Sequence, residues 1–320
     1  MSKTINVPGR NEVSITGTLH NVVMREGTTK PEKGAKPYRS GTITVRVNQH
    51  YGANGGVDEV SEIPVEFIAM KFKKDGTINS AWERLGDFLE NGPFKSIQQV
   101  GLDRASRIRV PAKFATLNEN MYSPDGETIR TTWRISSSFF NQMRGTGEPG
   151  TANADAATFC MDVFLMTMDR EVSSEGEETG RLHIRGAVVQ YGQRLDVLDF
   201  YVENPSAIDF IERNYNVNDT VNLVGRIRYT SATEEIHEES SWGEVIPKTT
   251  TRYKHELIVV NGSDAPYEDE MAYDPTDIAT LNADRQGRRE QIKIDYRNSK
   301  AAKAAAKAPV ASAAETYDWE

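Results

Sequence analysis

Lysine, arginine and aromatic residues lie close together in several short stretches of the chain. This mixture can bind single-stranded nucleic acid, because cations contact the phosphates and aromatic faces stack on the bases. The first half supplies most of the candidates, namely Lys30, Lys33, Lys36, Tyr38, Arg39, Arg46, Lys71, Phe72, Lys73, Lys74, Arg107, Arg109, Lys113, Tyr122, Arg130 and Arg134. The second half supplies a smaller set, namely Arg181, Arg185, Tyr191, Arg226, Arg228 and Trp242.

Each of these residues also has a plainer interpretation. A strand at the surface of a soluble protein places charged side chains on its solvent-exposed face, so a single arginine is often only part of the solvated surface. The Lys-rich stretch 27–39 is equally well explained as a solvated loop. Trp82 and Trp133 have the spacing of core residues, whereas Tyr38, Tyr122 and Trp242 lie in polar stretches with no apolar pattern that would bury them. The aromatic residues in polar loops are therefore the better candidates for stacking.

Catalysis has little support in the sequence. The five histidines show no metal-ligand spacing and no Glu-x-x-His pair. The glycine-rich stretches at 52–56 and 145–150 lack the Lys-Ser/Thr of a phosphate loop. No nucleophile has an adjacent base. The single cysteine, Cys160, excludes an internal disulfide and a cysteine-based zinc cluster. We expect no enzyme, no metal and no cofactor.

The distribution of charge matters more than the net charge of −9. Residues 1–150 carry 20 basic and 16 acidic side chains, residues 151–263 carry 10 and 19, and residues 264–320 carry 8 and 12. The first part is therefore basic, while the middle and the end are acidic. We expect the first part to dominate binding to a polyanion, with the acidic end as an internal competitor.

Hydrophobic periodicity predicts strands in a repeated order. Residues 42–47 alternate strictly, as a half-buried strand does, and residues 81–89 read as a short helix closed by Asn-Gly-Pro. The order of strand, loop, strand, hairpin, strand, short helix, strand, long loop and strand occurs twice. We therefore predict an all-β protein with two five-stranded OB-fold-like barrels, each with a short helix.

The repeats define four regions. We predict a basic first barrel at 1–140, a linker at 141–156, an acidic second barrel at 157–263 and an acidic, low-complexity, partly helical or disordered tail at 264–320. Within that tail, residues 264–273 are expected to be unstructured. Residues 277–307 have helical composition, but their apolar positions are too sparse for a packed stripe.

The stretch from Asn204 to Tyr229 carries a family resemblance. An apolar helix that opens at Pro205 is followed by an Asn-rich turn and by the strand Val-Asn-Leu-Val-Gly-Arg-Ile-Arg-Tyr at 221–229. Gly225 inside this strand predicts a bulge where a small barrel closes. With the third strand and helix at 62–92, the pattern resembles the bacterial and phage single-stranded-DNA-binding proteins, twice over, with an acidic tail.

This resemblance implies sequence-independent binding and protection of single-stranded DNA during replication or recombination. It also implies that the last residues, Tyr317, Asp318, Trp319 and Glu320, bind replication or recombination proteins.

No apolar run approaches the roughly 18 residues of a membrane span, and the first residues lack an apolar signal region. We expect no membrane partner and a cytoplasmic location, in the host if the chain is phage-encoded. Oligomeric state stays open, and a virion structural or assembly protein built from β-barrels is the alternative.

Overall fold

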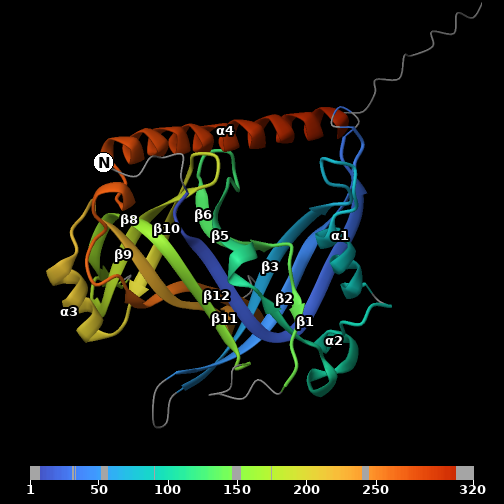
Figure 1. The fold of residues 1–320 in the computed structure, drawn as a ribbon, viewed down its shortest axis with the longest axis horizontal. Coiled ribbons are helices and arrows are strands. Elements are labelled where there is room, and N and C mark those ends of the chain that lie inside the picture. The colour runs from blue at the N-terminus through green and yellow to red at the C-terminus, as the bar shows by residue number, and fades with distance from the viewer. Residues whose placement is uncertain are drawn as a thin grey trace, which may run out of the picture.

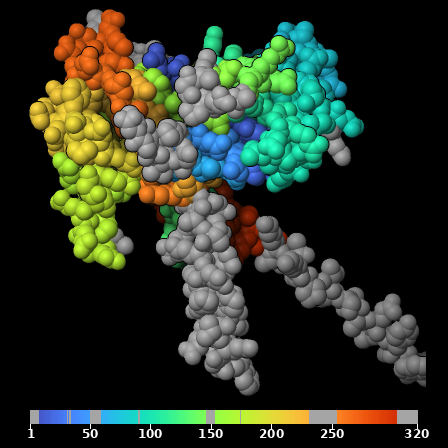
Figure 2. All heavy atoms as spheres, turned by 90° about the horizontal axis from the view of Figure 1, so that it is seen from below, coloured from blue at the N-terminus to red at the C-terminus, as the bar shows by residue number. Residues whose placement is uncertain are grey.

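The computed structural model winds a single hydrogen-bonded sheet into two adjacent barrels (Figure 1). The structure describes residues 8–30, 32, 34–51, 57–89, 91–145, 153–173, 175–239 and 245–307. Figure 2 shows the blue to teal residues of the first barrel beside the yellow to orange residues of the second. In the described part of the chain, no helix is both long and apolar enough to cross a membrane.

The first barrel contains the five strands predicted from the sequence and a further one in a stretch expected to be a loop. Its strands are β1 (Asn11–Thr28), β2 (Pro37–Tyr51), β3 (Val57–Met70), β4 (Arg107–Val110), β5 (Ala115–Tyr122) and β6 (Arg130–Ser137), with a short β7 (Asn141–Gln142) beside β4. β1, β2 and β3 form an antiparallel meander, β3 runs parallel to β6, and β6 pairs with β5. β4 returns to β1 and closes the barrel. The strand expected at 107–110 is β4, and it ends there because Pro111 has no N–H for the ladder and a 3-10 turn, η4 (Ala112–Phe114), follows it. The stretch 118–127, expected to be a polar loop, instead begins within β5.

Short helices cover one end of the first barrel. They are α1 (Ser80–Leu85), η2 (Gly86–Phe88), α2 (Ile97–Val100) and η3 (Leu102–Arg104). The Asn79 side chain caps α1 by accepting a hydrogen bond from the Ala81 N–H at 3.1 Å. The apolar face of this segment is buried, and Phe88 stacks on Phe94 with ring centroids 4.4 Å apart. The helix between the third and fourth strands is therefore where the sequence predicts it.

The second barrel repeats the arrangement more regularly. Its strands are β8 (Ala156–Val172), β9 (Glu178–Gln190), β10 (Arg194–Val202), β11 (Thr220–Glu239) and β12 (Val245–Gly262), with α3 (Pro205–Asn214) after the third strand. β8, β9 and β10 pair in sequence, β10 runs parallel to β12, and β11 pairs with both β12 and β8. The predicted fold class, two OB-like barrels with helices and a partly helical C-terminal segment, is confirmed.

Gly225 lies at the bulge predicted for β11. The pairing of β11 with β12 shifts register between Val224 and Gly225. A Cβ atom at Gly225 would lie 2.1 Å from the Ile258 carbonyl oxygen and 2.4 Å from the Phe159 ring. The absence of a side chain therefore lets two strands and an aromatic ring approach closely where the barrel closes.

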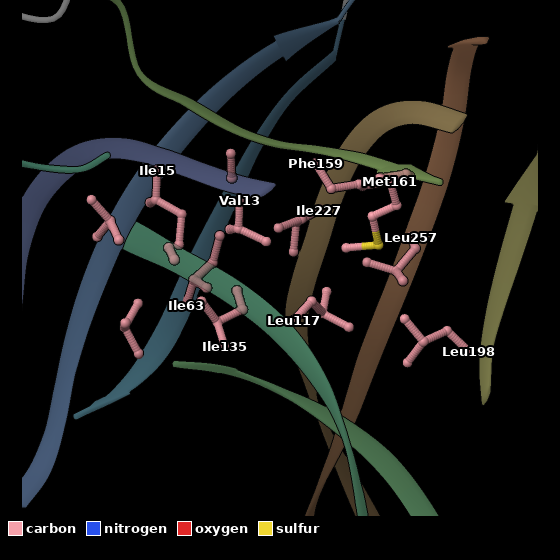
Figure 3. Packing of buried hydrophobic residues seen from close by; sticks show 14 of the residues in the cluster. Val13, Ile15, Ile63, Leu117, Ile135, Phe159, Met161, Leu198, Ile227 and Leu257 are labelled. Atoms are coloured by element: carbon pink, nitrogen blue, oxygen red, sulfur yellow. The ribbon is translucent and has the colours of Figure 1, made fainter. Parts of the chain in front are cut away.

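The two barrels share one core. The first third of β1 pairs with β8, from Asn11 opposite Met161 to Thr16 opposite Ala156. Figure 3 shows Val13 of β1 between Ile63 of the first barrel and Phe159 of the second, and all three are buried. A continuous apolar cluster therefore runs through both barrels, which fixes their relative position.

The C-terminal segment corrects two sequence expectations. Residues 264–273, expected to be unstructured, include a 3-10 turn, η5 (Asp269–Met271), and the buried Tyr273. A helix, α4 (Pro275–Lys307), follows and lies across both barrels in Figure 1. Ile278 and Leu281 pack with Tyr273 on the outer face of β8–β10. Two apolar residues one turn apart are enough to dock the helix, because a polar contact on the following turns adds to them. Arg285 forms a buried ion pair with Glu119 of β5.

Candidate nucleic-acid interface

An open groove of about 770 Å³ crosses the outer face of the first barrel. It runs over β1, β2, β3 and β6, and residues from the turn before β5 form one wall. Its lining mixes apolar, hydroxyl and charged groups, namely Val23, Arg25, Ser40, Gly41, Thr42, Glu66, Phe67, Ile68, Phe114, Arg134, Ser136, Ser137, Ser138 and Phe139. Strand alternation explains this lining: Ile43 and Val65 point into the core, so Thr42 and Glu66 face outward.

Two phenylalanines form an aromatic wall of this groove. Phe114 and Phe139 have ring centroids 4.4 Å apart and planes inclined by 33°. Phe114 remains 46% exposed, and its neighbour Lys113 holds Nζ 6.0 Å from the ring centroid. Phe140 is buried in the core, whereas Phe139 is partly buried, packs against the core and also lines the groove. An exposed ring beside a cation is the combination on which an unpaired base can stack.

Cations flank the groove at two places. Arg25 donates from Nε to the Ser40 Oγ at 3.1 Å, and Arg134 donates from Nη1 to the Glu66 Oε2 at 3.0 Å. The Arg134–Glu66 pair is exposed on both sides, so water screens it and a phosphate can compete for the guanidinium. The groove therefore offers cations beside an aromatic wall.

A basic turn follows β3 at one end of the groove. Lys71 holds Nζ 5.5 Å from the Phe72 ring centroid and 5.1 Å from that of Trp82. Phe72 is 41% exposed, and Lys73 and Lys74 beside it are also exposed. The predicted residues 71–74 follow Ile68, which lines the groove, after two intervening residues. Lys71, Phe72, Lys73 and Lys74 therefore form one largely exposed basic and aromatic turn.

A second groove of about 500 Å³ continues along the same strands. Thr44 and Pro64, which line it, are opposite each other, one outward position beyond the Thr42–Glu66 pair of the first groove. Glu62 lies here, 3.3 Å from the His20 ring and 3.9 Å from Arg46. Arg46 therefore lies beside this second groove, where the carboxylate of Glu62 partly compensates its charge.

The outer face also extends across β6 to β5. Asn118 is paired with Arg134, and Tyr122 with Arg130, and residues directly opposite in an antiparallel pair share a face. Tyr122 and Arg130 are both exposed at the far end of this face. Two further predicted residues thereby join the surface that carries the groove.

The remaining predicted residues that the structure describes do not line either groove. Lys30, Lys36, Arg109, Arg185 and Tyr191 are exposed, and Tyr191 is 89% exposed at the tip of the β9–β10 hairpin. Tyr38 is half-buried and packs against Gly27. Lys33, Trp242 and the tail residues Tyr317, Asp318, Trp319 and Glu320 lie outside the described residues.

Arg39 requires a correction. The sequence predicts a phosphate contact, but the residue is only 7% exposed. Its guanidinium lies 3.6 Å from the Trp82 ring centroid, donates to the Trp82 carbonyl at 2.7 Å and pairs with Glu26 at 2.8 Å. Cation–π stacking and these polar contacts make Arg39 a structural residue between β2 and α1.

Arg107 is corrected in the same way. Its Nη2 lies 2.6 Å from the Asp155 carboxylate, which is buried, and it also donates to the Asn153 carbonyl at 2.8 Å. Arg107 therefore links the first barrel to the segment that leads into the second. Its charge is already compensated, so we assign it no phosphate contact.

In the second barrel, three predicted arginines belong to an ion-pair network. Arg228 lies 2.7 Å from Glu203, 2.9 Å from Glu256 and 3.1 Å from Glu59 of β3. Arg226 also contacts Glu203, and Arg181 contacts Glu256 and Glu171, with separations of 2.8, 2.9 and 3.5 Å. These arginines hold strands and barrels together, which is a correction to their predicted role.

The network changes the acidity of its members. Burial alone would raise the pKa of Glu203, but the hydrogen bond from Arg228 and the nearby arginine charges outweigh burial and lower it. The pKa of Glu256 is lowered for the same reason, with Arg181 contributing. Burial alone would lower the pKa of Arg228, but its carboxylate partners raise it. The four carboxylates thus neutralise this side of the second barrel.

Sequence reasoning missed three prominent groove residues, Arg25, Phe114 and Phe139. Two signals were available. Lys113-Phe114 repeats the basic–aromatic pairing of Lys71-Phe72, and Phe139-Phe140 is a pair of adjacent aromatic residues just after a predicted strand. Arg25 carried no signal of its own, since its position depends on how far β1 extends.

Comparison with known proteins gives one family. The model of the family described as YorF matches residues 10–296. No curated protein matches the chain. Among solved structures, the wild-type single-stranded DNA binding protein from Thermus aquaticus is 14% identical, with 84% of this chain and 99% of that chain covered and a TM-score of 0.48. A deletion mutant of that protein is 16% identical, with 84% and 98% covered and a TM-score of 0.48.

Proposed function

The chain belongs to the YorF family, and we propose that it binds single-stranded DNA without sequence preference. The observation that carries the proposal is the groove of the first barrel, where Phe114 and Phe139 form an aromatic wall and Arg25 and Arg134 lie beside it. Stacking on an aromatic ring suits every base, and cations along the path suit every phosphate. Binding of this kind involves no catalysis.

Single strands are preferred over duplex in this proposal. A base can stack on Phe114 only when it is not stacked within a double helix. The serines and threonines of the groove, such as Ser136 and Thr42, supply small polar groups that suit a sugar–phosphate backbone. The role that follows is the protection of exposed strands during replication or recombination, in a phage or its host.

The first barrel dominates binding in this proposal. Most of its predicted cations that the structure describes are exposed, and Arg134 lines the groove, whereas Arg181, Arg226 and Arg228 of the second barrel are paired with carboxylates. Residues 1–150 are also basic and residues 151–263 acidic. The second barrel then serves mainly to support the first through the shared core.

Replacement of both groove phenylalanines tests the proposal. In the full chain, Phe114→Ala with Phe139→Ala should weaken binding to labelled oligo-dT by about 1–3 kcal/mol for each stacked base, measured by fluorescence anisotropy at low salt. Phe210→Ala is the matched control, because Phe210 is a comparably exposed ring on the second barrel. Wild-type protein that does not bind oligo-dT at low salt, or a double variant that binds as tightly as the control, contradicts the proposal.

A further inference from the structure

Four basic residues follow one flank of α4. Arg289, Lys293, Arg297 and Lys300 are spaced by four, four and three residues, so they lie above one another on successive turns. Arg297 and Lys300 are exposed, while Arg289 and Lys293 are partly exposed. We call these four residues the α4 stripe. From Arg285 to Lys300 the helix carries six basic residues and only two acidic ones.

The α4 stripe is held in place by the body of the protein. Arg285 donates to both oxygens of the buried Glu119, with Nε 2.8 Å from Oε2. Arg288 donates to the Leu195 carbonyl at 2.6 Å. Ile278 and Leu281 anchor the first turns in an apolar cluster. The stripe therefore has a fixed position relative to both barrels, unlike charges on a free tail.

The stripe begins where the outer face of the first barrel ends. Gly126, in the turn between β5 and β6, packs against α4: a Cβ atom there would lie 2.8 Å from the Arg297 Cγ and 3.1 Å from the Tyr296 Cδ1. The exposed Tyr122 and Arg130 flank this turn. A strand that leaves the groove past these two residues therefore reaches the stripe.

Three acidic side chains lie near the stripe, and two of them have hydrogen-bond or ion-pair partners. The Asp125 carboxylate accepts hydrogen bonds from the backbone N–H groups of Glu127 and Thr128, each at 2.8 Å, and from the Thr128 hydroxyl at 2.7 Å. Glu290 pairs with Lys293 at 2.8 Å. Glu127 is exposed in the turn as well. The basic residues of the stripe outnumber these carboxylates.

We infer that the α4 stripe is a second binding site for the DNA backbone, which takes the phosphates of a strand that continues beyond the groove. The inference rests on the proposed function and extends it. The site lies in the basic middle of the C-terminal segment, between its acidic patches at 264–277 and 315–320. Only strands longer than the groove can use both sites.

The test compares two lengths of oligo-dT on the full chain. The stripe variant is Arg289→Gln, Lys293→Gln, Arg297→Gln and Lys300→Gln together. A short oligomer of roughly 8 nucleotides fits within the site size of one OB-fold, and a long one has about three times that length. The stripe variant should bind the short oligomer as wild type does and the long one about tenfold more weakly at low salt. The slope of log K against log salt for the long oligomer should flatten by about 0.7 for each lost phosphate contact.

A charge-matched control separates the site from net charge. Arg104→Gln, Arg170→Gln, Arg213→Gln and Lys254→Gln remove the same charge from exposed positions away from α4, and this control should keep the wild-type preference for the long oligomer. The stripe variant could melt at a lower temperature than wild type. In that case the double variant Arg297→Gln with Lys300→Gln, which changes only the two most exposed residues, should still give half of the flattening of the salt dependence.

Failure of the inference is distinguishable from failure of the proposed function. Wild-type protein that binds neither oligomer overturns both. Loss of binding in the Phe114/Phe139 double variant, with wild-type length dependence in the stripe variant, overturns only the inference. So does binding to anionic lipid vesicles that the stripe variant loses while its DNA binding is unchanged.

Discussion

Arg285 of α4 and Glu119 of β5 form a bidentate ion pair that is 2% and 1% exposed. The pair connects the C-terminal helix to the first barrel. Arg194 of the second barrel donates to the Glu119 carbonyl at 3.1 Å and to the buried Asp196 carboxylate at 2.9 Å. Burial raises the pKa of Asp196 despite the opposing charge of Arg194. Three segments that are distant in sequence thus meet at one buried polar cluster.

Removing one partner of this pair should destabilise the protein strongly. Arg285→Met leaves the Glu119 carboxylate buried without its partner, which should cost about 3–5 kcal/mol of unfolding free energy in a urea titration. Arg285→Met combined with Glu119→Leu should recover most of that loss, because no uncompensated charge remains. Equal losses in the single and the double variant would mean that the pair itself does not hold α4 in place.

Arg228 should act on stability rather than on DNA binding. Arg228→Gln removes a cation shared by Glu59, Glu203 and Glu256, so the melting temperature should fall by several degrees, about 1–3 kcal/mol for a broken charged network. The affinity of the folded protein for oligo-dT should stay within about twofold of wild type. Arg134→Gln, on the groove, should show the reverse pattern. A loss of affinity in Arg228→Gln without a loss of stability contradicts the assignment.

The network also predicts how stability depends on pH. The folded-state pKa values of Glu203 and Glu256 are lowered below 4.5, so their stabilising contribution is present above about 4.5 and is lost as the pH falls through the folded values. Burial lowers the pKa of His255 below its usual 6.5. Stability therefore also falls as the pH drops below about 6.5, because the unfolded chain takes up this proton more readily. Glu203→Gln should therefore flatten the decline of unfolding free energy between pH 5 and 3, roughly the window of these carboxylates. Glu212→Gln, at an exposed position on α3, is the control and should leave the decline unchanged.

The last ten residues give a prediction from sequence alone. Deletion of residues 311–320 removes Glu315, Asp318 and Glu320 and should strengthen binding to oligo-dT at low salt, with the gain fading as salt screens the charges. Replacement of Tyr317 and Trp319 with alanine should give no such gain, because the competition is electrostatic. Any loss in that variant should concern binding to polymerase or helicase partners. Unchanged affinity after deletion would show that the acidic end does not compete for the groove.

The sequence predicted the barrels better than the site. Strict alternation at 42–47 and the Gly-Arg-Ile-Arg strand at 225–228 depend on local periodicity, which one sequence contains. The roles of Arg39, Arg107 and Arg228 depend on partners in other strands, which one sequence does not contain. The predicted cations were therefore identified as a group, but those that bind carboxylates were not separated from those that face solvent.

The docking of α4 shows the same limit. Ile278 and Leu281 are too few to predict a packed helix, and the deciding contact joins Arg285 to Glu119, 166 residues earlier. A buried arginine looks like a surface arginine in sequence. The groove phenylalanines were missed for a related reason, because the 3-10 turn before β5 interrupts the alternation that would have placed Phe114.

The position of β1 has a consequence for how the chain folds during synthesis. The residues from Thr18 onward pair with β2 as soon as that strand leaves the ribosome, and Ile15–Thr18 pair with β4, but Asn11–Ser14 must wait for β8, about 150 residues later. Contacts of such sequence separation form slowly, because a long loop has to close first. The first barrel therefore emerges with the start of its first strand unpaired, and an unpaired edge can join another chain. Translation speed between residues 28 and 161 thus sets how long a nascent chain carries that exposed edge.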